Sequence, residues 1–365
     1  MSNTAHRAYR YQPSTHTVKH AVNEYGYVLI ALAARNIFPM LGDLQALVVL
    51  QTLVHLFLCL FVLYFLLDST LQKRLFVVLY AINPLILHIT TFPFYYFWTV
   101  LPSLALAIIW LKPNKIQIWM PILTPIILLS LFIRPTSIFL AAFIYVLAFM
   151  INKKNGSRTM VAGSFICFVI GSFMIFNQPT QRSLFHTIYL GIGAYSNPYN
   201  IDKLDDTEGF KYYKKIKGVT ISTHPIHGNW KKKTVMQDYN QAIKQRYFEI
   251  WQQSPVLLLK NAVLNTIQAF SFGYDTKHFW TRLLSMGLGI FVIGLFYSTQ
   301  QWVWIVSILL SASFTFYFPP VPVYLYGSYL LLTFGFMGAL EKIVQRGLWH
   351  RIQLFLSSQF KCSTR

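Results

Sequence analysis

The sequence predicts an all-α polytopic membrane protein with about nine transmembrane helices and one large extracytoplasmic loop. Two observations carry this prediction. The 365 residues are 55% hydrophobic and only 12% charged, whereas a soluble domain carries about 25% charged residues. Apolar runs approaching the roughly 17–25 residues that a bilayer requires also recur along the chain. A soluble globular protein is therefore excluded.

The expected transmembrane helices follow the apolar runs in order. They cover residues 44–67, 75–91, 94–111, 118–133, 135–151, 159–177, 282–298, 302–318 and 323–340. Several are short and contain proline, which predicts kinks or half-helices at Pro84, Pro102, Pro121 and Pro125. The chain then divides into five parts: a tail (1–43), a first bundle (44–177), a loop (178–281), a second bundle (282–340) and a basic tail (341–365).

The charges predict how these parts face the two sides of the membrane. Lys and Arg outnumber Asp and Glu by 31 to 11, and they gather in three short loops (68–74, 112–117, 152–158) and in the tail after 340. Positive loops stay in the cytoplasm, so we expect the C-terminus there and the 178–281 loop outside. The excess also suits membrane lipids or phosphate-bearing substrates. Nucleic acid is not expected, since no compact basic domain is present.

Two regions outside the bundles are predicted to contain amphipathic helices. Residues 25–41 are apolar but interrupted by Arg35 and Asn36, which favours a helix in the membrane interface. In the loop, residues 178–236 read as irregular, and a second amphipathic helix is expected from Pro255 to about 270. The helix predicted over 237–253 has one apolar stripe at helical spacing, formed by Tyr239, Ile243, Tyr247, Ile250 and Trp251.

The loop stretch 186–210 concentrates four of the chain's 11 acids, namely Asp202, Asp205, Asp206 and Glu208. Carboxylates outside the membrane can act as general bases or bind a divalent cation, which makes a divalent cation a candidate cofactor. The alternative is a solvated turn, because Asn-Pro, Asp-Asp and Glu-Gly are loop-forming pairs. Gly191 and Gly193 lack a nucleotide-binding context and more simply allow a close backbone approach to a helix or a ligand.

Basic and aromatic residues near the same face are candidate ligands of an anionic substrate. Arg134 lies between two apolar spans, where a charge is costly and usually functional, and its guanidinium suits a lipid-linked phosphate. The alternative is snorkelling to the interface. His186 is a candidate for phosphate binding or a structural hydrogen bond. No metal site is expected: Pro225 separates His224 from His227, and the cysteines share no ligand spacing, being Cys59, Cys167 and Cys362.

Three stretches together resemble a known family. Residues 25–67 resemble an interfacial helix with the turn NIFPMLGD and a following span. Residues 75–111 suggest a tight hairpin through Asn83-Pro84 and TTFPFYYFW, and residues 131–137 give LFIRPTS. This order is similar to the membrane half of the C-type (GT-C) glycosyltransferases, which include protein O-mannosyltransferases and lipid A aminoarabinose transferases. The stretch from 185 to 210 also resembles a motif of bacterial glycosyltransferase-like membrane proteins.

The resemblance implies a bacterial inner-membrane enzyme that uses a polyprenyl-phosphate-linked sugar and a glycan, lipid or protein acceptor. It assigns base roles to Asp205, Asp206 or Glu24. Members of the family begin with a further transmembrane helix followed by a catalytic Asp, so we expect this chain to lack that helix. The substrate-binding residues expected are Arg134, Arg182, His186, Tyr189 and Tyr199. An O-antigen-type polymerase or ligase, and a lipid-linked oligosaccharide transporter, are the alternatives.

Overall fold

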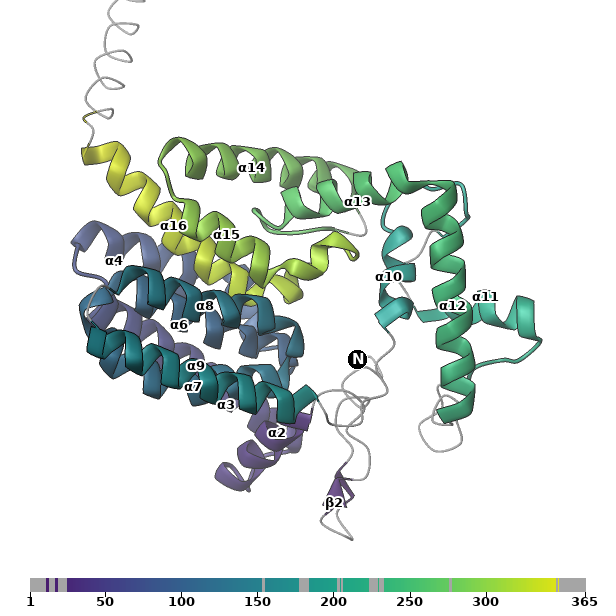
Figure 1. Cartoon of the computed structure of the whole chain (residues 1–365), viewed down its shortest axis with the longest axis horizontal. Helices are drawn as coiled ribbons and strands as arrows, with labels where there is room; N and C mark the ends of the chain where they lie inside the picture. The colour runs from purple at the N-terminus through teal and green to yellow at the C-terminus, as the bar shows by residue number, and fades with distance from the viewer. Residues whose placement is uncertain are drawn as a thin grey trace, which may run out of the picture.

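In the residues that the computed structural model describes, regular structure is helical apart from an antiparallel ribbon of two-residue strands, β1 (Tyr11–Gln12) with β2 (Thr17–Val18). It describes residues 11–12, 17–18, 25–152, 155–176, 184–201, 204, 206–222, 229, 233–275, 278–345 and 347. Figure 1 shows a bundle of long helices with the helices of the 178–281 loop at one end. The bundle contains α2 (Tyr25–Ile37), α3 (Asp43–Phe61), α4 (Thr70–Phe76), α5 (Pro84–Thr90), α6 (Val100–Leu111), α7 (Ile116–Ile133), α8 (Ile138–Ile151), α9 (Asn155–Phe176), α14 (Phe279–Ser298), α15 (Trp302–Ser311) and α16 (Tyr326–Gln345).

Among the described residues, five helices are long and apolar enough to cross a membrane: Asp43–Leu66, Pro113–Ile133, Gly156–Phe176, Phe279–Ser298 and Pro322–Gln345. A bent pair, Thr70–Ala81 with Pro84–Thr90, makes a sixth if it counts as one span. Apolar helices of 10–17 residues occupy the other three predicted spans, as Tyr95–Leu111, Pro135–Ile151 and Trp302–Ser311. The chain is therefore a helical, multi-pass membrane protein.

The surface of the long helices has the polarity expected in lipid. In α14 the buried residues are Ser285, Gly289 and Phe296, whereas Phe291 and Leu284 are each about three-fifths exposed, at 61% and 58%. Water-soluble surfaces rarely collect apolar side chains in this way. Small residues inside and large apolar residues outside are the pattern of helices that pack closely in a membrane.

The predicted positive loops lie together at one end of the bundle, here called the basic end. Lys112 contacts the Asp68 carboxylate at 2.9 Å, and Ser157 donates to Gln117 at 3.2 Å. Gln72 donates to Glu341 at 2.8 Å, which brings the start of the C-terminal segment to the same end. These loops therefore lie at one end of the bundle, as expected for loops that share one side of a membrane.

The predicted kink at Pro84 is present, but Asn83-Pro84 does not form the tight hairpin expected from the sequence. The chain bends there by 55° between helical segments, after the π-helical turn η2 (Val77–Ala81). Asn83 caps α5 by accepting from the Leu85 N–H at 2.9 Å, and Pro84 stands at the first helical position, where its missing N–H costs nothing. The sequence misled because a cap followed by proline starts a helix as readily as it makes a turn.

Side chains of α3 satisfy the backbone carbonyls around this bend. Gln51 donates to the Thr90 and Phe92 carbonyls at 3.1 and 2.9 Å, and His55 Nε2 lies 3.3 Å from the Ala81 carbonyl. In the tautomer that carries its proton on Nε2, His55 donates to this carbonyl, and its Nδ1 accepts from the Tyr326 hydroxyl at 3.0 Å. Irregular backbone inside a membrane protein requires such partners, so these polar residues hold the broken span in place.

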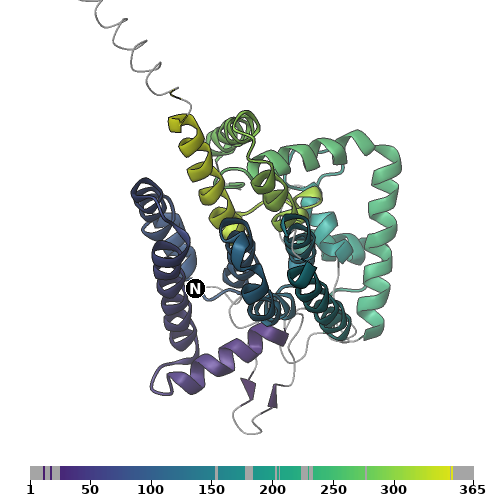
Figure 2. The same cartoon turned by 60° about the vertical axis from the view of Figure 1, so that its left-hand side comes forward.

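The opposite end of the bundle, here called the loop end, carries α2 and the loop helices. Figure 2 shows α2 running across the direction of α3, as a helix in the membrane interface would. Gly26 of α2 packs on the backbone of α7, where an added Cβ would lie 2.7 Å from the Ile133 nitrogen. Only glycine allows this contact, which brings α2 next to the end of α7.

The described part of the loop contains four α-helices: α10 (Leu184–Ile192), α11 (Asp206–Lys217), α12 (Lys233–Gln253) and α13 (Pro255–Gln268). The two amphipathic helices were predicted correctly, but α10 and α11 lie where the sequence suggested irregular structure. In α12, Tyr239, Ile243 and Ile250 are fully buried as expected. Trp251, the last residue of the predicted stripe, is half exposed (51%) and does not belong to the buried face. The stripe extends beyond the surface of α12 that packs against α10.

Candidate functional site

Arg134 lies at the loop end, where α7 ends and irregular segments meet. It closes α7 in an extended conformation (φ −140°), with its N–H donating to Ser130, and Pro135 prevents the helix from continuing. Its guanidinium donates to the Tyr96 hydroxyl at 2.6 Å. The same group lies 5.0 Å from the centre of the Tyr95 ring and 4.4 Å from that of Tyr96. The aromatic rings thus hold a part-buried cation in one orientation.

The aromatic support of Arg134 continues into the second half of the chain. Tyr96 belongs to the 3₁₀ turn η3 (Tyr95–Thr99) and stacks on Tyr324 of η8 (Pro322–Leu325), with ring centres 4.1 Å apart. Tyr324 also packs against Phe318, at 5.8 Å. We refer to Arg134, Tyr95, Tyr96 and Tyr324 as the Arg134 centre. Short 3₁₀ segments at such a depth are tolerated where protein surrounds them or where they line a cavity.

The loop helices dock beside this centre. An added Cβ on Gly191 of α10 would lie 2.0 Å from the Tyr317 carbonyl oxygen, which confirms the predicted close backbone approach. Tyr274, after α13, donates its N–H to Pro320 at 2.8 Å. Phe318, in the same turn, packs against Tyr324 of this centre. The 317–320 turn therefore connects the loop to the Arg134 centre.

Tyr189 and Tyr199, both predicted to bind substrate, converge on a residue that the sequence did not suggest. The Arg246 guanidinium of α12 lies 5.5 Å from the Tyr199 ring and 5.6 Å from that of Tyr212. Its charge also acts on Tyr189, whose hydroxyl pKa burial raises to about 12. Tyr189 therefore stays protonated at neutral pH and can serve as a hydrogen-bond donor. Arg246 was overlooked because it reads as an ordinary solvated position of an amphipathic helix.

His186 has a packing role that its sequence context left open. Its Nδ1 and the Tyr239 hydroxyl form a hydrogen bond, and its ring stacks on Phe210 with centres 5.4 Å apart. Gly209 lies directly against this pair. His186 therefore joins α10, α11 and α12, so that both described ends of the stretch pack against α12.

The predicted acids lie mostly beyond what the structure describes. Glu24, Asp202 and Asp205 are outside the described residues, as are Arg182, His224 and His227; of Asp206 only the backbone is described, as the first residue of α11. Glu208 contacts Lys211 at 3.0 Å. Within the described ranges, no group of three His, Cys, Asp or Glu side chains could hold a metal ion.

A second arginine that the sequence did not suggest lies near the first turn of α14. Arg282 donates to the Tyr274 hydroxyl at 3.2 Å and reaches the Ala194 carbonyl at 3.5 Å. Next to it, Gln268 donates to the Tyr195 hydroxyl at 2.6 Å, which in turn donates to Asn265 at 2.9 Å. Arg282 opens a predicted span, and its polar setting comes from residues far along the chain.

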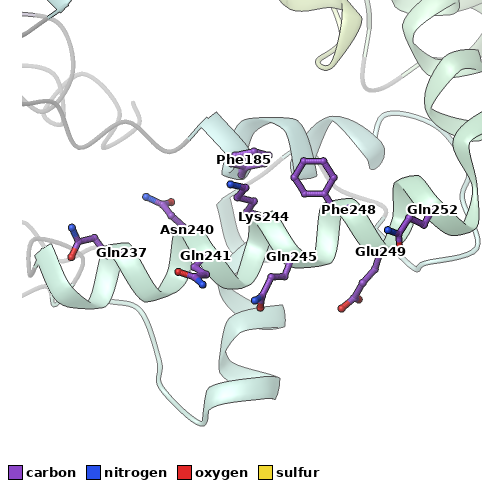
Figure 3. A pocket seen from close by; sticks show the side chains of 9 residues that line it. All are labelled: Phe185, Gln237, Asn240, Gln241, Lys244, Gln245, Phe248, Glu249 and Gln252. Atoms are coloured by element: carbon purple, nitrogen blue, oxygen red, sulfur yellow. The ribbon is translucent and has the colours of Figure 1, made fainter.

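The outer face of α12 forms an open groove of about 1100 Å³ (Figure 3). Its walls carry two phenylalanines, five carboxamides, a lysine and a glutamate, namely Phe185, Phe248, Gln237, Asn240, Gln241, Gln245, Gln252, Lys244 and Glu249. We call this surface the α12 groove. Comparisons with protein-family models, curated proteins and solved structures found no match to this chain.

Proposed function

We propose that the protein is a membrane glycosyltransferase that moves a sugar from a polyprenyl-phosphate donor to an extracytoplasmic glycan, lipid or protein acceptor. The observation that carries the proposal is the fixed guanidinium of Arg134 at one end of a membrane bundle. A charged group there is costly unless it is used, and a lipid-linked phosphate reaches a protein at this depth. Arginine matches phosphate oxygens with two parallel N–H donors.

The proposal includes a GT-C-like arrangement of nine crossings. This arrangement is supported by the turns between the helices, which alternate along the chain between the basic end and the loop end of the bundle. Contacts at the basic end join loops 68–74, 112–117 and 152–158 to the C-terminal segment. Those at the loop end join 94–99, 134 and 317–324. In this arrangement the three short apolar helices cross together with their 3₁₀ extensions, the basic end is cytoplasmic, and the loop is extracytoplasmic in a bacterial inner membrane.

The reaction needs a base and a stabilised leaving group. A carboxylate takes the proton of the acceptor hydroxyl, while the oxygen of that hydroxyl bonds to the anomeric carbon of the sugar. The bond from that carbon to the phosphate oxygen breaks, and the electron pair stays on the phosphate, whose charge Arg134 and Arg182 stabilise. Asp205, Asp206 and Glu24 are the proposed bases. His186, Tyr189 and Tyr199 form the wall of the site, and a divalent cation remains a candidate cofactor.

Undecaprenyl phosphate, without a sugar, is a suitable first probe. Added to the full chain purified in detergent, it should raise the thermal midpoint of the wild type. Arg134→Met should abolish this shift. Arg134→Lys should retain part of it, because lysine keeps the positive charge but lacks the two parallel N–H donors of arginine. Arg158→Met is the matched control: Arg158 lies 5.3 Å from the Phe149 ring at the basic end and should leave the shift unchanged.

Transfer itself is tested with a panel of labelled polyprenyl-phosphate sugars and membranes containing the protein. Addition of one sugar to an acceptor, lost in Arg134→Met and in the variant with both Asp205→Asn and Asp206→Asn, is the expected result. Chain elongation would instead indicate the polymerase. Movement of intact donor across vesicles without transfer would indicate the transporter. If undecaprenyl phosphate raised the thermal midpoint equally in the wild type and in Arg134→Met, the proposed phosphate-binding role of Arg134 would be wrong.

A further inference from the structure

The α12 groove combines polar and aromatic groups in an unusual proportion for this chain. Five of its nine lining residues are carboxamides. Two phenylalanines pack against each other in its wall: Phe185 of α10 and Phe248 of α12 have ring centres 5.9 Å apart at an interplanar angle of 49°. Nearly half of Phe248 (46%) is exposed. Apolar surface left exposed in a polar surrounding often marks a binding site.

The groove runs along the exposed side of α12 and reaches the edge where α12 meets α10. The opposite face carries Tyr239, Ile243 and Ile250, which are fully buried, so α12 is already anchored without the groove residues. Figure 3 shows Lys244, Phe248 and Phe185 on the side of α12 that faces α10, with the glutamines following along the helix. The Lys244 ammonium lies 5.5 Å from the Phe185 ring.

The charge of the groove indicates what it binds. The chain carries a net charge of +20, yet the described lining residues include one cation, Lys244, and one anion, Glu249, whose carboxylate pairs with Arg246 at 2.9 Å, so this lining does not collect charge of either sign. A surface suited to a polyanion would collect positive charge instead. Hydrocarbon is also excluded, because it would bury the carboxamides without hydrogen bonds. Each carboxamide offers both donors and an acceptor, which matches hydroxyl groups that donate and accept.

We propose that the α12 groove binds a neutral oligosaccharide, the glycan part of the acceptor. The phenylalanine rings contact the C–H face of a sugar ring, and the carboxamides bind hydroxyls along the chain. This proposal rests on the proposed function, since it names the acceptor class of the same enzyme. It also explains why the partly exposed ring of Phe248 stands among carboxamides.

The test uses the full chain in detergent and a panel of neutral oligosaccharides of four to eight hexose or N-acetylhexosamine units. Saturable binding by calorimetry is expected for the wild type. Phe248→Ala should raise Kd about tenfold, the loss expected for one aromatic contact, and Phe248→Trp should restore binding. Gln241→Ala with Gln245→Ala should also weaken it. Gln253→Ala, an exposed amide of α12 outside the groove lining, is the matched control.

The outcomes separate this proposal from the transferase itself. Arg134→Met should lose sugar transfer and keep oligosaccharide binding, whereas Phe248→Ala should raise the acceptor KM and leave the shift with undecaprenyl phosphate intact. Oligosaccharide binding without any sugar transfer would support the proposed role of the groove and contradict the proposed transferase function. Absence of binding across the panel, binding that the Phe248 and glutamine variants leave unchanged, or a preference for extended peptides or anionic glycans would each overturn the proposal for the groove.

Discussion

Gly191→Ala offers a direct test of how the loop docks on the membrane bundle. The new Cβ would lie 2.0 Å from the Tyr317 carbonyl oxygen and 3.0 Å from its carbon, where 3.4 Å is an ordinary contact. Relief therefore requires a displacement of about 1.4 Å, the difference between 3.4 and 2.0 Å. Both contacting groups are backbone, so no side-chain rotation relieves the clash. Over-packing of this kind costs about 1–3 kcal/mol.

The displacement should separate α10 from the 317–320 turn, which supports the Arg134 centre. We expect a thermal midpoint in detergent that is several degrees lower, faster proteolysis of the α10–α11 segment, and a weaker response to undecaprenyl phosphate. Gly294→Ala adds the same methyl group where nothing lies within 4 Å. This control should be neutral or stabilise the helix by up to about 1 kcal/mol. If both variants melted and digested like the wild type, the docking described here would be wrong.

Other consequences of the structure are open to measurement. Gln51→Leu removes the donors to the Thr90 and Phe92 carbonyls and should lower stability by about 1–2 kcal/mol, seen as a lower thermal midpoint; an unchanged midpoint would show that the bend needs no such partner. In the loop, the Tyr213 hydroxyl, followed by Lys217, holds the pKa of Asp238 below its ordinary value. A depressed pKa stabilises the fold above the unfolded value, near pH 4, and that contribution is lost as pH falls through the folded value. Asp238→Asn should therefore flatten the acid limb of a melting-temperature profile, and an identical limb would argue against the pairing. Lys115→Cys and Lys214→Cys should be labelled by an impermeant maleimide from opposite sides of the membrane, and labelling from one side would contradict the proposed orientation.

Composition and periodicity were sufficient for the helical architecture and for several local features. Each apolar run became helical, in one segment or, as at 75–91 and 302–318, in shorter segments, because a membrane protein must satisfy its backbone internally. The basic loops share one end, as the contact of Lys112 with Asp68 shows, since nothing offsets the cost of moving clustered cations through lipid. Gly191 was predicted to allow a close approach, and it does. These features depend on a residue and its immediate neighbours.

The candidate site depends on contacts that no local pattern reveals. Tyr96 and Tyr324 stack from positions 228 residues apart (324 less 96), and Arg246 meets Tyr199 only because α12 folds back on the segment after α10. The sequence marks Arg134 as unusual, but it cannot show that two tyrosine rings orient its guanidinium. The acids that drew attention first have partners of their own where they are described, as Glu208 has in Lys211.

α13 shows why periodicity alone leaves the inward face of a helix undecided. Its buried side includes Asn261, Asn265 and Gln268, while Val256 and Leu259 are 76% and 66% exposed. The same amphipathic pattern in water would bury the apolar side, so the reversed choice requires an apolar surrounding. Lipid against α13 accounts for it and would give the hydrogen-bonding side chains a dry interior beside Tyr195 and Arg282. The polarity of this helix thus reflects the solvent around it, and its exposed apolar side extends the lipid-facing surface of α14 onto the part of the loop that directly precedes α14.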